Sequence, residues 1–178
     1  DVVDLKSKGH LGGSLELIES QTFTTTQYVD FTSIKGSGYD VHCLQFSLTE
    51  CTGALVFQIS NDGGSTFETT GYKVAYQYGS VNGTFGESRG TNAGSIGDFG
   101  SGGSGKKKSG YIYFYNLNSS DKYSLATGHG YLEHPTLSKY FLYGSGIYPT
   151  TETHDAIRLS AVTGTSTGTA TLFGIKQI

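Results

Sequence analysis

Hydrophobic and polar residues alternate with a period of two along several stretches of the chain. In 38–50, Leu44, Phe46 and Leu48 alternate with polar residues, and Ala54–Ser60 repeats the pattern. Two stretches near the end, Ile157–Ala161 and Thr169–Ile175, show it again. This alternation is typical of strands with one buried face, and the last two stretches predict a hairpin around a turn at 163–168.

Weaker versions of the pattern predict further strands. They lie at Ser14–Ser20, Gln27–Thr32, Tyr72–Tyr78, Tyr111–Leu117 and Tyr140–Tyr143. No window of ten residues has clean helical spacing free of Gly and Pro; the best candidate is Leu137, Tyr140 and Phe141, after Pro135, for one or two helical turns.

Seven to nine short strands joined by polar turns predict an all-β fold, an antiparallel β-sandwich with a single core. The specific version we expect is jelly-roll-like, with eight strands in two Greek keys. A propeller or solenoid would need a fixed internal repeat, which the sequence lacks. We expect residues 1–13 to form an arm or linker and residues 14–178 to form one domain.

Composition narrows the class of protein. The chain has 178 residues, 27 of them Gly and 13 Tyr, and a formal net charge of −3. No stretch approaches the ~20 apolar residues of a membrane span. Lys106, Lys107 and Lys108 are the only basic run, a short footprint for nucleic acid, so we expect neither nucleic acid nor membrane as a partner. A start at Asp1 in a chain without Met leaves open an excised segment or a processed precursor.

The two cysteines lie too far apart for a disulfide if they share one strand and its turn. Cys51 lies eight positions after Cys43, which is roughly 26 Å of extended chain at ~3.3 Å per residue. We expect two reduced thiols, with Cys43 in or near the core. Their spacing also does not match a metal site, and no cofactor is expected.

The stretch 79–110 is unusual because it has 11 glycines in 32 residues. We expect a long loop that is mobile in a monomer and ordered only against a neighbour. Its candidate assembly contacts are Phe85, Ile96, Phe99, Lys106, Lys107 and Lys108. Within it, 100–107 nearly matches a phosphate-binding loop, but the Ser or Thr after the lysine is missing and a strand follows, so we reject that function.

The sharpest local motif is Ser60-Asn61-Asp62-Gly63-Gly64-Ser65-Thr66-Phe67. It resembles the Asp-box of sialidase propellers, a structural hairpin turn that lies away from the active site. Asp62 would accept hydrogen bonds from turn amides, and Gly63 and Gly64 would take positive φ. Phe67 would pack the next strand onto the core.

Evidence for catalysis is weak in the sequence. His129, Glu133 and His134 lie close together and His154 precedes Asp155, but no established zinc spacing occurs. A nucleophile elbow is also missing. Paired carboxylates across strands would leave no linear spacing, so a glycan hydrolase or esterase stays an alternative that would need a cleft with paired acids.

Tyrosine offers a candidate binding surface. If Ile112 and Phe114 face the core, then Tyr111, Tyr113 and Tyr115 form a row on the opposite face of the strand. Exposed aromatic rows suit a sugar or a protein neighbour, because Tyr presents both an apolar ring and a polar tip. Cross-strand packing under the Gly-rich loop is the alternative.

Three segments resemble β-sandwich domains of bacteriophage virion proteins (tail fibres, head fibres and decoration proteins). They are the closing pair 155–176, the turn Ser60–Phe67 and the middle strand with its polar turn, Tyr111–Ser120. The likeness covers 39–178 in order and spacing. It implies a non-enzymatic structural protein of the virion without catalytic residues, frequently a trimer, with other virion proteins as partners. The 79–110 stretch departs from the compact pattern. The alternative function is a carbohydrate-binding module or receptor-binding tip that recognises a surface glycan.

Overall fold

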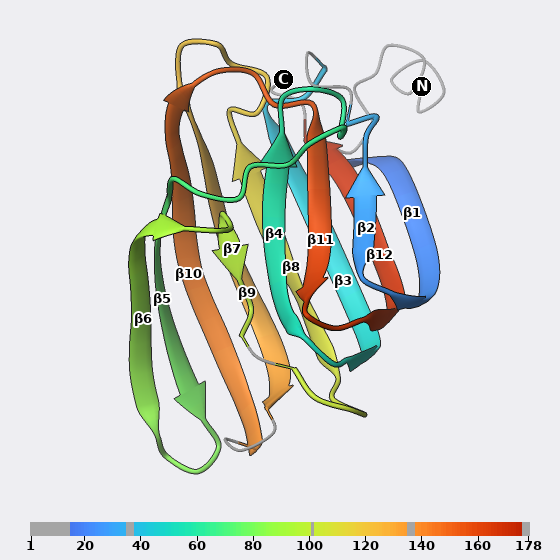
Figure 1. The fold of residues 1–178 in the computed structure, drawn as a ribbon, viewed down its shortest axis with the longest axis vertical. Helices are drawn as coiled ribbons and strands as arrows, with labels where there is room; N and C mark the ends of the chain where they lie inside the picture. Colours follow the sequence, from blue (N-terminus) through green and yellow to red (C-terminus); the bar gives the residue numbers. More distant parts are fainter. Residues whose placement is uncertain (1–14, 35–37, 101, 135–137, 176–178) are drawn as a thin grey trace, which may run out of the picture.

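A computed structural model of the chain describes residues 15–34, 38–100, 102–134 and 138–175. These residues form twelve strands in two antiparallel sheets, one of eight strands and one of four (Figure 1). The predicted arm at 1–13 lies outside the described residues. The strands are β1 (Leu15–Thr26), β2 (Tyr28–Phe31), β3 (Val41–Cys51), β4 (Ala54–Ser60), β5 (Tyr72–Ser80), β6 (Phe85–Ala93), β7 (Gly97–Asp98), β8 (Lys108–Tyr115), β9 (Tyr123–His134), β10 (Ser138–Thr151), β11 (Ala156–Val162) and β12 (Ser166–Ile175).

Eight of these strands have jelly-roll order. Strands from the two halves of the chain pair antiparallel as β1–β12, β2–β11, β3–β8 and β4–β7. Two further pairings, β12–β3 and β11–β4, join them into the layers β1-β12-β3-β8 and β2-β11-β4-β7. The predicted antiparallel, jelly-roll-like β-sandwich is therefore confirmed.

Four more strands widen one layer. The β5–β6 and β9–β10 hairpins are inserted between jelly-roll strands and extend the larger sheet in the order β8-β9-β10-β5-β6. In Figure 1 this extension reaches beyond β4, β11 and β2, and β7 with its flanking chain and the connection from β4 to β5 cross over part of it. The larger sheet thus has an inner face that is partly uncovered.

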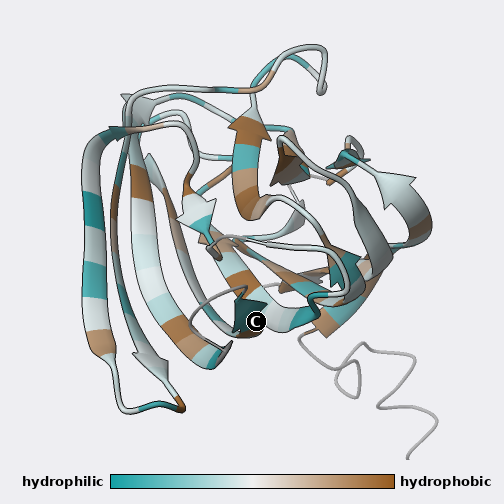
Figure 2. Cartoon of the chain, turned by 60° about the horizontal axis from the view of Figure 1, so that its bottom comes forward, coloured by the Kyte–Doolittle hydropathy of each residue, from teal (hydrophilic) through white to brown (hydrophobic). Residues whose placement is uncertain are grey.

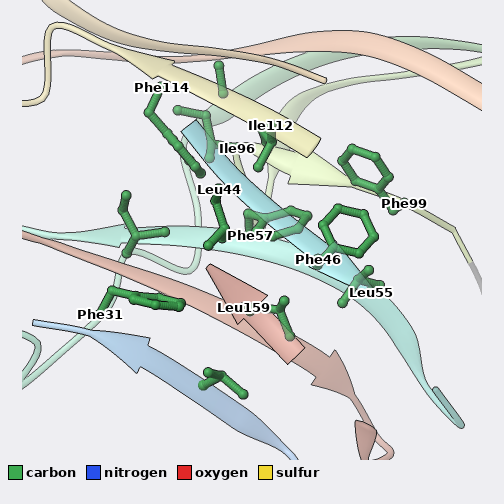
Figure 3. Close-up of a cluster of buried hydrophobic side chains, with 14 of the residues drawn as sticks. Phe31, Leu44, Phe46, Leu55, Phe57, Ile96, Phe99, Ile112, Phe114 and Leu159 are labelled. Atoms are coloured by element: carbon green, nitrogen blue, oxygen red, sulfur yellow. The ribbon is translucent and has the colours of Figure 1, made fainter. Parts of the chain in front are cut away.

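The core lies between the layers, where alternate residues of each strand point inward. Phe46 of the larger sheet meets Phe57 of the smaller sheet at a ring-centroid distance of 5.6 Å. Phe99, from the chain after β7, packs against both of these rings (Figure 3). Hydrophobic bands occur on strands of both layers (Figure 2). Each of these phenylalanines is almost fully buried, so they form one continuous core.

The prediction of a long, unanchored loop at 79–110 is wrong. This stretch contains β6, β7 and the start of β8. Ile96 and Phe99 are buried in the protein's own core, and glycines on the facing strands make room for them. A Cβ at Gly128 or Gly130 would lie 2.8 or 2.6 Å from the Phe99 ring. The stretch is anchored because the neighbouring strands lack side chains at these positions.

Three local predictions also need correction. The last two strands form no hairpin, because β11 and β12 belong to different sheets and the turn between them crosses the sandwich. The turn at 60–67 also leads from one sheet to the other, since β4 and β5 lie in different layers. Tyr140 and Phe141 lie in β10 and not in a helical turn, while Leu137 lies outside the described residues. The twelve strands exceed the seven to nine predicted, because β6, β7 and β9 were not predicted, whereas β5 and β10, the hairpin partners of β6 and β9, were predicted at least in part.

Candidate functional site

The predicted tyrosine row exists and lies on the outer face of the larger sheet. Ile112 and Phe114 are buried, while Tyr111, Tyr113 and Tyr115 project from the opposite side of β8. The ring centroids of Tyr111 and Tyr113 are 5.5 Å apart, and those of Tyr113 and Tyr115 are 6.4 Å apart. Strict alternation along β8 was enough to predict this row.

Strand pairing extends the row into a surface that the sequence did not predict. Cross-strand register places Tyr111 beside His129 of β9, and His129 beside Tyr143 of β10. The Tyr111 hydroxyl lies 3.2 Å from His129 Nδ1, within hydrogen-bonding distance, and the His129 and Tyr143 rings meet edge to face at 5.8 Å. We call the exposed or half-buried rings of this face the aromatic platform: Phe85, Tyr111, Tyr113, Tyr115, His129, Tyr131, Phe141 and Tyr143.

The aromatic platform borders shallow hollows. One of about 380 Å³ lies among Tyr111, His129, Tyr131 and Phe141, and another of about 430 Å³ lies beside Phe85. Phe85 packs edge to face on Phe141 at 6.4 Å and remains 74% exposed. Rings that flank open hollows can stack on the apolar faces of a ligand while their polar tips form hydrogen bonds.

A second feature of the outer face is an apolar row along one end of the larger sheet. Register places six residues side by side across six strands. They are Leu15, Ile175, Val41, Tyr115, Leu125 and Ile147. All six are exposed or half-buried, so this row meets water in the isolated chain. We call these residues the apolar row.

Tyr113 links the platform to a buried thiol. Cys43 lies on the outer side of β3, directly opposite Tyr113, and the two side chains form a hydrogen bond. Burial raises the pKa of the Cys43 thiol, and the neighbouring Cys43 raises the pKa of Tyr113. Cys43 and Cys51 are both free, as the sequence predicted. Cys43 is buried as expected, although on the outer side of the sheet, and Cys51 is buried too, which was not predicted. Neither thiol is in an exposed, electropositive setting of the kind that activates cysteine.

The six candidate assembly contacts do not form one surface. Ile96, Phe99 and Lys108 are buried inside the protein, so the prediction that they contact a neighbour is wrong. Lys108 Nζ donates hydrogen bonds to the Phe99 and Gly100 carbonyl oxygens at 3.2 and 2.5 Å. Lys107 is exposed and Lys106 half-buried, both in the chain before β8. Only Phe85 belongs to the aromatic platform.

The Asp62 turn forms as predicted, except for Phe67. Asp62 Oδ1 accepts hydrogen bonds from the Thr66 amide and the Ser60 hydroxyl, both at 2.8 Å. These bonds, the Thr66 amide foremost, lower the pKa of Asp62 to about 2. Gly63 and Gly64 have positive φ, as expected. Phe67 does not pack on the core; it is half-buried and its ring centroid lies 3.9 Å from the Arg158 guanidinium carbon.

The histidines that lie close together in the sequence do not share a site in the structure. His129 faces outward from β9, whereas His134 lines a pocket on the inner side of the sheet. No cluster of three or more His, Cys, Asp or Glu residues suited to a metal occurs in the described parts of the chain. Within the same residues, no helix is long and apolar enough to cross a membrane.

A Ser–His–Glu chain was missed by the sequence analysis because its members come from separate elements. Ser124 Oγ lies 2.9 Å from His154 Nδ1, and His154 Nε2 lies 3.5 Å from Glu152 Oε1. Burial lowers the pKa of His154, against a smaller opposing effect of Glu152. Ser124 and His154 are almost fully buried, so in this conformation the hydroxyl cannot reach a substrate. The group is a buried polar contact between β9 and the chain before β11.

Comparisons of the chain with protein-family models, with curated proteins and with solved structures found no match.

Proposed function

We propose that this chain is a non-enzymatic structural domain of a bacteriophage virion. It would be attached to the capsid or tail as a fibre or decoration domain and act in virion assembly or host attachment. The observation that carries the proposal is the apolar row, whose residues are exposed or half-buried across six strands. The strand order supports it, because viral capsid and lectin domains share the jelly roll.

The apolar row favours a role within an assembly. Contiguous exposed apolar surface is uncommon on soluble monomers and marks sites where another protein is bound. Leu15 is 45% exposed and Leu125 37% exposed, at separate points of the row. A second copy of the chain or another virion protein would cover both. The resemblance to virion domains favours a homotrimer as the form in which copies meet.

Two measurements test this proposal. Mass spectrometry and immunogold electron microscopy of particles, purified from the host that carries the gene, should find the protein at fixed stoichiometry. Light scattering after size exclusion should report an oligomer that Leu125→Ser combined with Ile147→Ser dissociates. Ser145→Ala, on the same face outside the apolar row, should leave the mass unchanged. A protein that is monomeric at high concentration and also missing from particles would overturn the proposal.

The second candidate function is recognition of a surface glycan by the aromatic platform. The specific observation in its favour is the line Tyr111–His129–Tyr143, which borders the 380 Å³ hollow. Sugar rings have apolar faces that stack on aromatic rings and hydroxyls that bond to polar tips. This function is compatible with a receptor-binding tip of a fibre.

A glycan array decides the second candidate. Tyr111→Ala and Tyr113→Ala should each lose binding that the parent chain shows. Tyr28→Ala is the matched control, since Tyr28 is exposed on the smaller sheet. Unchanged binding in both platform variants would show that the glycan binds outside the aromatic platform. An array on which the parent chain binds no glycan would contradict this function.

A further inference from the structure

A polar pocket on the inner side of the larger sheet is separate from the aromatic platform. Its volume is about 210 Å³, and it lies where β5, β6 and β10 extend beyond the smaller sheet (Figure 1). Inward residues of these strands, the end of β9 and the chain around β7 line it. They are Tyr76, Tyr78, Ser88, Asp98, Gly100, His134, Tyr140 and Leu142.

One pocket residue has a hydrogen-bonding group that the protein leaves unused. Tyr76 is only 6% exposed, and its hydroxyl has no hydrogen-bond partner among the described residues. The Asp98 backbone lies near this hydroxyl without forming a hydrogen bond of normal geometry. An unpaired buried hydroxyl costs stability. A ligand in the pocket would supply the missing partner.

The charges around the pocket balance. The Asp98 side chain accepts a hydrogen bond from the Gly100 amide at 2.7 Å. Lys108 lies behind the same segment, with its ammonium bonded to the Phe99 and Gly100 carbonyl oxygens. Burial lowers the pKa of Lys108 to about 8, so most of the ammonium is charged at neutral pH. One positive and one negative group favour neither an anion nor a cation, which leaves a neutral ligand.

Aromatic rings form the rest of the pocket wall. The Tyr78 and Tyr140 rings meet edge to face at 6.0 Å, and His134 lies 5.7 Å from Tyr140 in the same manner. Aromatic rings beside a carboxylate and a free hydroxyl suit a molecule with apolar C–H faces and several hydroxyls. The volume equals about seven water molecules at ~30 Å³ each, which is room for one sugar ring.

We propose that this inner pocket binds one neutral sugar ring, with the Tyr76 hydroxyl and the Asp98 carboxylate as its hydrogen-bonding partners. The site lies on the opposite face of the sheet from the aromatic platform, so it goes beyond the proposed virion function and does not depend on it.

Amide NMR titration of the full chain tests the proposal. The probes are D-glucose, D-galactose and D-mannose at millimolar concentrations, with sodium acetate and ammonium chloride as charged comparisons. At least one sugar should shift the amides of Asp98 and Gly100, and the two salts should not. Tyr76→Phe keeps the ring and removes only the hydroxyl, so it should weaken that binding about tenfold, the loss expected for one buried hydrogen bond.

Two further variants test whether the sugar binds in the inner pocket or at the aromatic platform. Asp98→Asn should also weaken binding, whereas Tyr143→Phe on the aromatic platform should leave it unchanged. Without sugar, Tyr76→Phe should be at least as stable as the parent chain, because no hydrogen bond is lost. The proposal is overturned if none of the sugars shifts these amides, if a salt shifts them instead, or if Tyr76→Phe binds as tightly as the parent.

Discussion

Arg158 and Asp30 form a two-point ion pair between β11 and β2, with Nε–Oδ1 and Nη2–Oδ2 distances of 2.7 Å. The guanidinium also lies against two rings, 4.2 Å from the Tyr28 centroid and 3.9 Å from that of Phe67. Phe67 belongs to the Asp62 turn, so this contact ties the turn to the outer face of the smaller sheet. Its geometry depends on a planar, forked cation.

Arg158→Lys should lower the free energy of unfolding by about 1 kcal/mol, because lysine keeps the charge but loses the fork and most of the stacking. The expected loss is small because the side chains of both partners are partly exposed, at 21% for Arg158 and 30% for Asp30. Urea unfolding of both proteins measures the difference. Arg89→Lys on the exposed edge strand β6 is the control and should change little. Equal losses in the two variants would contradict the role of the fork.

Gly146→Ala should be destabilising by ~1–3 kcal/mol through overpacking. A Cβ at Gly146 would collide with the Ile96 carbonyl oxygen, which lies directly over β10. Gly38→Ala is the matched control, because no atom lies within 4 Å of a Cβ there. Denaturant unfolding of both variants measures their free energies of unfolding. If Gly146→Ala were as stable as the control, the 94–100 segment would not pack closely on β10.

Stability should fall as the pH drops below about 6.5, the pKa of histidine in an unfolded chain. Burial lowers the folded-state pKa of His42 and His154, so the unfolded state binds more protons in this window and acid favours it. The slope approaches about 1.4 kcal/mol per pH unit for each histidine that stays neutral when folded. Unfolding curves between pH 8 and 5 measure it.

His154→Gln identifies the contribution of one histidine to that slope. It removes one titrating group, so its stability should depend less on pH than that of the parent, whatever its stability at pH 8. An unchanged slope would show that His154 takes up its proton equally in the folded state.

The Asp62 carboxyl should titrate near its low pKa of about 2 in a carbon-detected NMR experiment. Thr66→Val removes the hydroxyl that donates to Asp62 Oδ2 at 2.7 Å, so the midpoint should rise. Ser65→Ala is the control, since the Ser65 hydroxyl donates to the Asp62 carbonyl oxygen and not to the carboxylate. The stability from these bonds is present above the unfolded-state pKa and is lost as the pH falls toward 2. A midpoint unaffected by Thr66→Val would assign the lowered pKa to the other donors, chiefly the Thr66 amide and the Ser60 hydroxyl.

The sequence by itself determined the strands that alternate strongly. The patterns at Ala54–Ser60 and Ile157–Ala161 correspond to β4 and to most of β11, because a half-buried strand needs apolar residues at every second position. The same reasoning correctly predicted the outward tyrosine row on β8. The Asp62 turn could also be predicted from the sequence, because the carboxylate that accepts its hydrogen bonds and the two glycines with positive φ lie within a few residues of one another.

Strands without that pattern could not be predicted from the sequence. β6 is an edge strand with mostly exposed side chains, so its sequence contains few apolar residues. β9 presents the small residues Ser124, Ala126 and Gly128 to the core, and Phe99 fills the space above Gly128 and Gly130. A small residue is buried there only because a ring from a distant part of the sequence covers it, so the local sequence does not predict its burial.

Only the tertiary structure decided which strands pair, and with that the candidate sites. β11 and β12 look like a hairpin in the sequence, but the turn between them crosses the sandwich because each strand completes a different sheet. The aromatic platform arises where register sets β8, β9 and β10 side by side, and the inner pocket brings together Tyr76, Asp98 and Tyr140. Long-range pairing depends on the burial of whole sheet faces, a property of all the strands together that no single segment contains.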